Sequence, residues 1–266
     1  WKVSKGENVM WIMGTQSPLA KKMEWESRDV GKTIAQSDEV LFETSVEVKT
    51  DQGMFRNMLL IPSLFKARKN PDDAELKDVL TPELYQRWSI LKAKYIGRDS
   101  SIEKWRPIFA AQELYEKAIA KSGLSTENIV RPVVVEAAEK NKKKIIRPKI
   151  EITIEKPKAM IKEFSNSSLE DMECFSKTLD RLETDLNSMI ERGNAWAIGD
   201  VDGLTKLTYA DQNVSCISAF TNAAVVQKRG LSDIRKRSMD AWLAAADTAL
   251  AKNKSTFAVL PMGELL

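Results

Sequence analysis

The sequence contains no histidine among its 266 residues. A histidine general base, a histidine-assisted nucleophile and a histidine-ligated metal are therefore excluded as the basis of any activity. For the same reason the two cysteines, Cys174 and Cys216, cannot form the thiolate–imidazole pair of a cysteine hydrolase. A membrane-spanning helix needs about 18 consecutive apolar residues. No stretch of the sequence reaches that length, and we expect no membrane span.

The chain also lacks an excess of charge of one sign. Lysine and arginine number 41 against 38 aspartates and glutamates, a formal net charge of +3. This balance gives no reason to expect nucleic acid or a membrane surface as the main partner. The one dense basic run, residues 140–144, could contact phosphate but is more typical of a solvated helix end.

Strand patterns dominate residues 1–50. Lys2–Ser4 and Asn8–Met13 flank Lys5-Gly6-Glu7, which predicts a hairpin whose second strand is central in a sheet because it is apolar on both faces. Glu39–Val48 is the next predicted strand. Glu43 is then a carboxylate inside a largely apolar strand and requires an explanation.

Helical periodicity begins near residue 54 and predicts a helical insertion over about 54–145. Thr81 and Pro82 form a strong helix start, and the apolar residues after them recur on one face: Leu84, Trp88, Leu91 and Tyr95. The remaining pattern predicts a strand at 150–155, helices over 157–252 and a final strand at 256–260. Within 157–252 we expect one long helix at 169–190 and another at 211–228.

Strands at both ends and in the middle of the chain, with helices between them, favour one domain spanning residues 1–266. We expect an α/β (α+β) fold, with a mixed β-sheet core built from the N-terminal, middle and C-terminal strands. A large helical insertion and helical cover would complete it.

Several segments, in order along the chain, resemble the TraB/GumN family, which includes the Tiki-type metalloproteases. They are Trp1–Val3 with the strand that ends at Gly14-Thr15, Glu39–Glu43, Ile154–Pro157, Ala195–Asp200 followed by Leu204, Arg237 within Arg235–Met239, and Thr256–Val259. Together they cover nearly the whole chain.

The resemblance implies a metal site that this sequence departs from. Active relatives are expected to carry two Gly-x-x-His motifs whose histidines, with glutamates, hold a divalent metal that activates water. Here the first motif reads Gly14-Thr15-Gln16-Ser17 and the second reads Pro261-Met262-Gly263-Glu264. Both histidine positions are thus changed, and Met160 stands where the family has a glutamine.

The resulting hypothesis is a non-catalytic pseudoenzyme with a binding or scaffolding role. It has no assigned catalytic, cofactor-binding or metal-binding residue, and the vestigial candidates are Ser17, Glu43, Glu155, Arg237 and Glu264. We expect that Glu43 and Arg237 form a buried ion pair where the family has its metal site. We further expect Met13, Met262 and Trp11 to fill it.

Two catalytic alternatives remain open. Glu43, Glu155 and Glu264 could converge into an all-oxygen site for Mn, Mg or Ca in a metal-dependent hydrolase or peptidase. Less favoured is Ser17 acting as a nucleophile with Lys21 or Lys22 as its base.

The resemblance also implies a location in the bacterial envelope. The chain begins at Trp1, and we presume that a signal peptide has been removed and that the protein is periplasmic or secreted. The expected partner is an envelope protein or peptide, with no role for nucleic acid. Cys174 and Cys216 then form a disulfide if the protein is exported, and remain two buried thiols if it is not.

Overall fold

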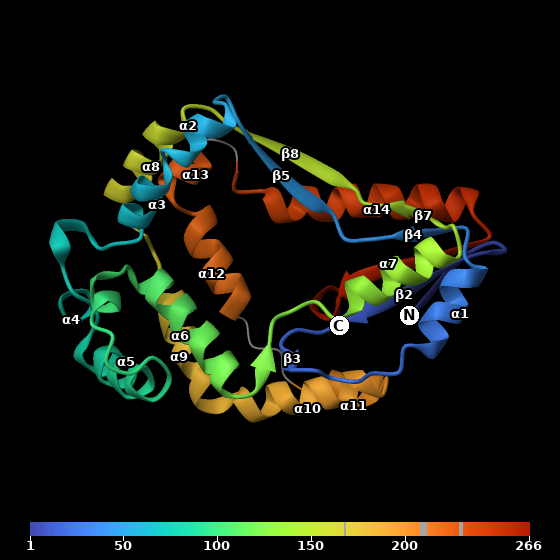
Figure 1. Ribbon diagram of the computed structural model, residues 1–266, viewed down its shortest axis with the longest axis horizontal. Coiled ribbons are helices and arrows are strands. Elements are labelled where there is room, and N and C mark those ends of the chain that lie inside the picture. The colour runs from blue at the N-terminus through green and yellow to red at the C-terminus, as the bar shows by residue number, and fades with distance from the viewer. Residues whose placement is uncertain (168, 208–211, 229–230) are drawn as a thin grey trace.

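The computed structural model describes residues 1–167, 169–207, 212–228 and 231–266. A sheet flanked by helices lies at one end of the long axis, and a group of helices lies at the other (Figure 1). A long two-stranded ribbon connects the two ends along one side of the molecule. In the part of the chain described, no helix is both long enough and apolar enough to cross a membrane.

The main sheet has five strands in the order β1-β2-β9-β4-β7. Their bounds are β1 (Lys2–Lys5), β2 (Asn8–Thr15), β9 (Ser255–Pro261), β4 (Glu39–Leu41) and β7 (Lys144–Ile146). β1 pairs with β2 as the predicted antiparallel hairpin, with Gly6 in its turn at φ +62°, and the other pairs are parallel. The α/β prediction is confirmed. However, the strand that the middle of the chain contributes to this sheet is β7, at the sheet's edge, and not the strand predicted at 150–155.

Helices cover both faces of this sheet. α1 (Arg28–Gln36) and α7 (Val130–Lys140) pack on one face, where Val40 and Phe257 enter the core, and α14 (Ile234–Lys252) packs on the other face against Leu41 and Ala258. Because side chains alternate along a strand, apolar residues at successive β4 positions serve opposite faces. The sheet is therefore the central layer of three.

β5 (Ser45–Thr50) and β8 (Lys149–Ile154) form the ribbon that continues β4 and β7 away from the sheet (Figure 1). The strand predicted at 39–48 is thus two strands with a break between them. Leu41 pairs with Ile146 and Ser45 with Lys149, so the three residues 42–44 lie opposite the two residues 147–148. This extra residue makes a β-bulge, and Glu43 is its middle residue.

The helical group has its own apolar core. α5 (Pro82–Tyr95) starts where predicted, since Thr81 Oγ1 accepts a hydrogen bond from the Leu84 amide at 3.3 Å. Trp88 of α5 packs on Phe175 of α9 with ring centroids 5.7 Å apart. The other helices of this group are α2 (Met54–Met58), α3 (Ile61–Ala67), α4 (Leu76–Val79), α6 (Pro107–Lys121), α8 (Pro157–Asn166), α9 (Met172–Thr184), α12 (Gln212–Thr221) and α13 (Ala224–Gln227).

Two predicted helices are broken in the structure. The helix expected at 169–190 is α9 followed by α10 (Leu186–Ala197), which meet at Asp185. The carboxylate of Asp185 accepts hydrogen bonds from the buried Arg192 guanidinium at 3.1 and 2.7 Å, a contact that hydrophobic periodicity does not reveal. The helix expected at 211–228 corresponds to α12 and α13, and Asp211 lies outside the described residues.

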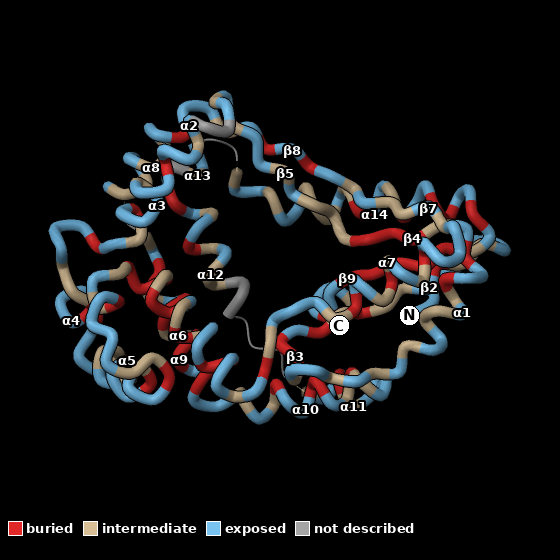
Figure 2. Tube along the Cα trace, in the orientation of Figure 1, coloured by how far each residue is buried: buried red, intermediate tan, exposed pale blue. Residues whose placement is uncertain are grey.

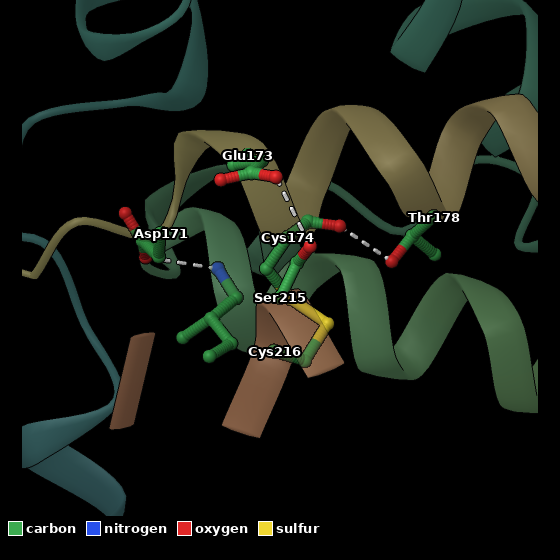
Figure 3. The surroundings of a disulfide bond; sticks show 7 residues. Asp171, Glu173, Cys174, Thr178, Ser215 and Cys216 are labelled. Atoms are coloured by element: carbon green, nitrogen blue, oxygen red, sulfur yellow. Dashed lines mark hydrogen bonds between the residues drawn. A yellow bond between two sulfur atoms is a disulfide. The ribbon is translucent and has the colours of Figure 1, made fainter. Parts of the chain in front are cut away.

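A disulfide joins Cys174 of α9 to Cys216 of α12, with a Cα–Cα distance of 4.6 Å (Figure 3). Around it, Thr178 Oγ1 donates to the Cys174 carbonyl at 2.8 Å, and Ser215 Oγ donates to Glu173 Oε1 at 3.2 Å. Of the two states left open by the sequence, the structure has the disulfide.

Candidate functional site

The parallel strands β2, β9, β4 and β7 all end at one edge of the sheet, which we call the carboxyl edge. In open α/β sheets ligands bind at this edge. Three candidate residues follow its strands: Ser17 after β2, Glu264 after β9 and Glu43 after β4. Topology thus brings both changed motifs and one glutamate to a single edge.

The ends of β2 and β9 are packed with apolar side chains. Met262 is 4% exposed and contacts Gly14, where an added Cβ would lie 2.8 Å from Met262 Cε. Trp196 of α10 is 6% exposed, and its Nε1 donates to the Gly14 carbonyl at 2.7 Å. Trp25 packs on Trp196 at 5.3 Å between ring centroids. These side chains therefore fill part of the space beside the first motif's glycine. A pocket of about 290 Å³ remains between α1 and α10, and Gly14, Met262 and Trp196 are among its lining residues.

The three residues expected to fill the old site differ in how far they are buried. Met262 fills the edge as predicted, and Met13 is partly buried against the same core. The prediction for Trp11 is wrong: this side chain is exposed, with the Lys2 ammonium 5.4 Å from its ring centroid. Trp11 pairs with Lys2 of the edge strand β1, whose residues are all exposed, so solvent reaches this part of β2.

Ser17 is exposed and its carbonyl accepts a hydrogen bond from Gln16 Nε2 at 3.3 Å. Lys21 Nζ instead donates to the Ala120 carbonyl at 3.2 Å, at the end of α6. Among the described residues no lysine hydrogen-bonds to Ser17, so the Ser–Lys arrangement is not formed.

Glu264 is the last residue of the short 3₁₀ turn η3 (Met262–Glu264) that follows β9. Its Oε1 forms an ion pair with Arg235 Nη2 at 3.0 Å. This is a surface ion pair, with the Arg235 side chain 57% exposed, and it directs the Glu264 carboxylate toward the arginine.

Glu43 occupies the bulge between β4 and β5. The preceding Phe42 is buried, and the guanidinium groups of Arg147 and Arg131 lie 5.1 and 5.8 Å from its ring centroid. Burial raises the pKa of Glu43; a hydrogen bond with its own backbone and the positive charge of Arg131 offset this only in part. Glu43 is thus a partly buried carboxylate at the edge, and its pKa lies above the usual range.

The predicted Glu43–Arg237 ion pair is not made. Arg237 lies in the first turn of α14, with Nη1 3.9 Å from Asp233 Oδ1 and Nη2 3.5 Å from the Glu151 carbonyl. The bulge shifts the register at Glu43, and the positive charge that acts on this carboxylate comes from Arg131 of α7. Sequence spacing did not indicate that Arg131, and not Arg237, would be the arginine near Glu43.

Glu155 lies away from the carboxyl edge. It is exposed just beyond the far end of β8, six residues after Lys149, whose partner Ser45 adjoins the bulge. At about 3.3 Å per residue, the ribbon separates Glu155 from Glu43 by roughly 20 Å. The prediction that Glu43, Glu155 and Glu264 converge is therefore wrong.

The donors present do not fit the divalent metal that the resemblance implies. Across residues 1–167, 169–207, 212–228 and 231–266, no three His, Cys, Asp or Glu side chains group closely enough to hold a metal ion. With Glu264 paired, Glu155 distant and Ser17 a poor ligand, Glu43 is the one predicted candidate left at the edge that could ligate a metal.

Sequence reasoning missed two residues of the edge. Trp196 packs against Gly14, and Arg131 provides the positive charge that acts on Glu43. Both come from helices distant in sequence from the strands they meet, so only tertiary structure pairs them. Met160, the residue in place of the family's glutamine, lies on α8 in the lining of an apolar groove in the helical group.

Comparison with known proteins gives one match. The model of the TraB/PrgY/gumN family matches residues 1–266. No curated protein and no solved structure gives a significant match.

Proposed function

The chain belongs to the TraB/PrgY/gumN family, and we propose that it is a non-catalytic member that acts by binding or scaffolding in the bacterial envelope. The observation that carries this proposal is the state of the carboxyl edge. Met262 and Trp196 pack against Gly14, and Glu264 is paired with Arg235.

The chemistry of the edge supports this reading. Metal-assisted hydrolysis requires several ligands around an open coordination position. The edge presents Glu43 with Arg131 and Arg147 nearby, and these positive charges oppose the approach of a cation. A binding role requires none of these ligands.

The disulfide supports the proposed location. Disulfides persist in oxidising compartments such as the periplasm and the exterior of the cell. Cys174 is almost fully buried, and the bond joins two helices in the core of the helical group. We therefore propose a periplasmic or secreted location, with an envelope protein or peptide as the partner.

The catalytic question is tested by digesting a peptide library with the purified protein in the presence of Mn, Mg, Ca or Zn. Glu43→Gln is the matched control, because it removes the partly buried carboxylate at the edge. We expect both proteins to give the same background. Cleavage by the wild type that the variant lacks would overturn the proposal.

The location is tested by counting thiols in protein isolated from its native cells without reductant. In denaturant, we expect no thiol to react before reduction and both cysteines to react after it. Two reactive thiols before reduction would place the protein in a reducing compartment.

A further inference from the structure

The segment 54–69, which covers α2 and α3, combines exposed apolar side chains with positive charge only. It contains no acidic residue, and its cations are Arg56, Lys66, Arg68 and Lys69. Leu59 is 77% exposed and Phe65 is 54% exposed. The other exposed apolar side chains of the segment are Met58, Ile61 and Leu64. Pale blue along α2 and α3 marks this exposure (Figure 2). Monomeric soluble proteins rarely expose contiguous apolar surface of this kind without a function.

An apolar groove of about 720 Å³ lies beside this segment, between α3 and α8. Leu64 and Phe65 line one side, and Met160 and Phe164 line the other. Arg68 is the single charged side chain among the described lining residues, and its guanidinium stacks on Trp105 at 3.9 Å from the ring centroid. The volume is within the range of about 300–1,000 Å³ that is typical of ligand sites.

The cations around the groove have no ionic partners. None of the four in segment 54–69 forms an ion pair with a described residue, nor do Lys158 and Lys162 of α8. Elsewhere in the molecule some cations are paired, as Arg87 is with Asp180 and Glu183. The net charge of +3 conceals a segment, 54–69, in which every charged residue is positive.

We propose that α2, α3 and α8 form a docking surface for an anionic lipid bilayer. Leu59 and Phe65 enter the boundary between headgroups and acyl chains, and the groove receives an acyl chain. The five exposed cations meet lipid phosphates: Arg56, Lys66, Lys69, Lys158 and Lys162. Helices that lie in a membrane interface combine an apolar face with lysine and arginine in this way. A second copy of the chain would bring the same unpaired charges together, which is unfavourable.

This inference is independent of the proposed function, because it involves no residue of the carboxyl edge. Its test is cosedimentation of the full, disulfide-bonded chain with vesicles of 30% phosphatidylglycerol in phosphatidylcholine, and with vesicles of phosphatidylcholine alone. We expect binding to the anionic vesicles that weakens as salt is raised.

Two double variants separate the two contributions. Lys66→Gln/Lys69→Gln is expected to weaken partitioning about tenfold or more, since each cation near an anionic surface contributes about a fivefold factor. Leu59→Ser/Leu64→Ser removes two leucines from the buried interface and is expected to weaken it at least about tenfold. Both pairs replace exposed side chains, and circular dichroism verifies folding.

The matched controls carry equivalent changes elsewhere. Ile90→Ser replaces an apolar side chain of α5 that is 63% exposed, and Lys140→Gln/Lys144→Gln neutralises the other dense basic run. Both are expected to bind vesicles as the wild type does. Three results would overturn the proposal: no binding to anionic vesicles, binding that survives in both test variants, or equal loss in the controls. Binding of monomeric short-chain phosphatidylglycerol without vesicle binding would replace the bilayer with a single lipid.

Discussion

Apolar side chains are buried at the carboxyl edge of the sheet and exposed at the α2–α3–α8 surface. At the edge, Met262 and Trp196 are almost fully buried and Glu264 is paired with Arg235. At the α2–α3–α8 surface, Leu59 and Phe65 are exposed, and the cations form no ion pair within the part of the chain that the structure describes. The fold predicts a ligand at the first place, and the side chains favour one at the second. Function follows the site and not the fold that carries it.

The largest effect that we expect concerns the support of the helical side. The disulfide holds α12 on α9, and Phe220 of α12 stacks on Phe164 of the groove wall at 6.3 Å between centroids. The cysteines are 42 positions apart in the sequence, and Cys174→Ala/Cys216→Ala should therefore lower the free energy of unfolding by about 4 kcal/mol. Denaturant unfolding measures this loss. An unchanged midpoint would mean that the disulfide does not stabilise the helical group.

Two methionine substitutions compare the two regions directly. Met262→Ala leaves a cavity beside Gly14 and should destabilise the protein by about 2–5 kcal/mol. Met58→Ala, on the exposed α2, should change the free energy of unfolding by no more than about 0.5 kcal/mol. Equal losses in urea unfolding would contradict the contrast between a packed edge and an open surface.

Gly14→Ala sharpens the account of the edge. The new Cβ would lie 2.9 Å from Met262 Sδ and 3.0 Å from Trp1 Cζ3, and overpacking of this kind costs about 1–3 kcal/mol. The same substitution in the Met262→Ala background should cost less, because the closest contact has been removed. A double-mutant cycle measures the difference, and strict additivity would show that Met262 does not fill this space.

The smallest expected effect is the pH dependence introduced by Glu43. Burial raises its pKa in the folded state, so the folded protein loses stability as pH rises from the unfolded-state pKa to the higher folded-state pKa. Glu43→Gln should therefore stabilise the protein at pH 8 and have little effect at pH 3, where both states are protonated. Exposed Glu155→Gln is the control. The measurement is the free energy of unfolding of each variant at pH 3 and pH 8. If Glu43→Gln were less stable than the wild type at pH 8, ionisation of Glu43 in the folded state would not be costly.

Much of the local structure could be predicted from the sequence. The Gly6 hairpin, the Thr81 cap and the apolar face at Trp88 depend on neighbours within a few residues. The break at Asp185 could not be predicted, because it involves a polar contact with Arg192 seven residues later that hydrophobic periodicity does not show. The bulge at Glu43 could not be predicted, because it depends on pairing with strands about 100 residues away. Composition missed the α2–α3–α8 surface, since acidic residues elsewhere cancel its charge in the total.

The most direct test of the filled, non-catalytic edge is a calorimetric titration of chelator-treated protein with Mn, Mg, Ca and Zn. The account predicts no stoichiometric binding of any of the four metals. Tight one-to-one binding that Glu43→Gln or Glu264→Gln abolishes would contradict it, and would show that carboxylates at the edge still form a metal site.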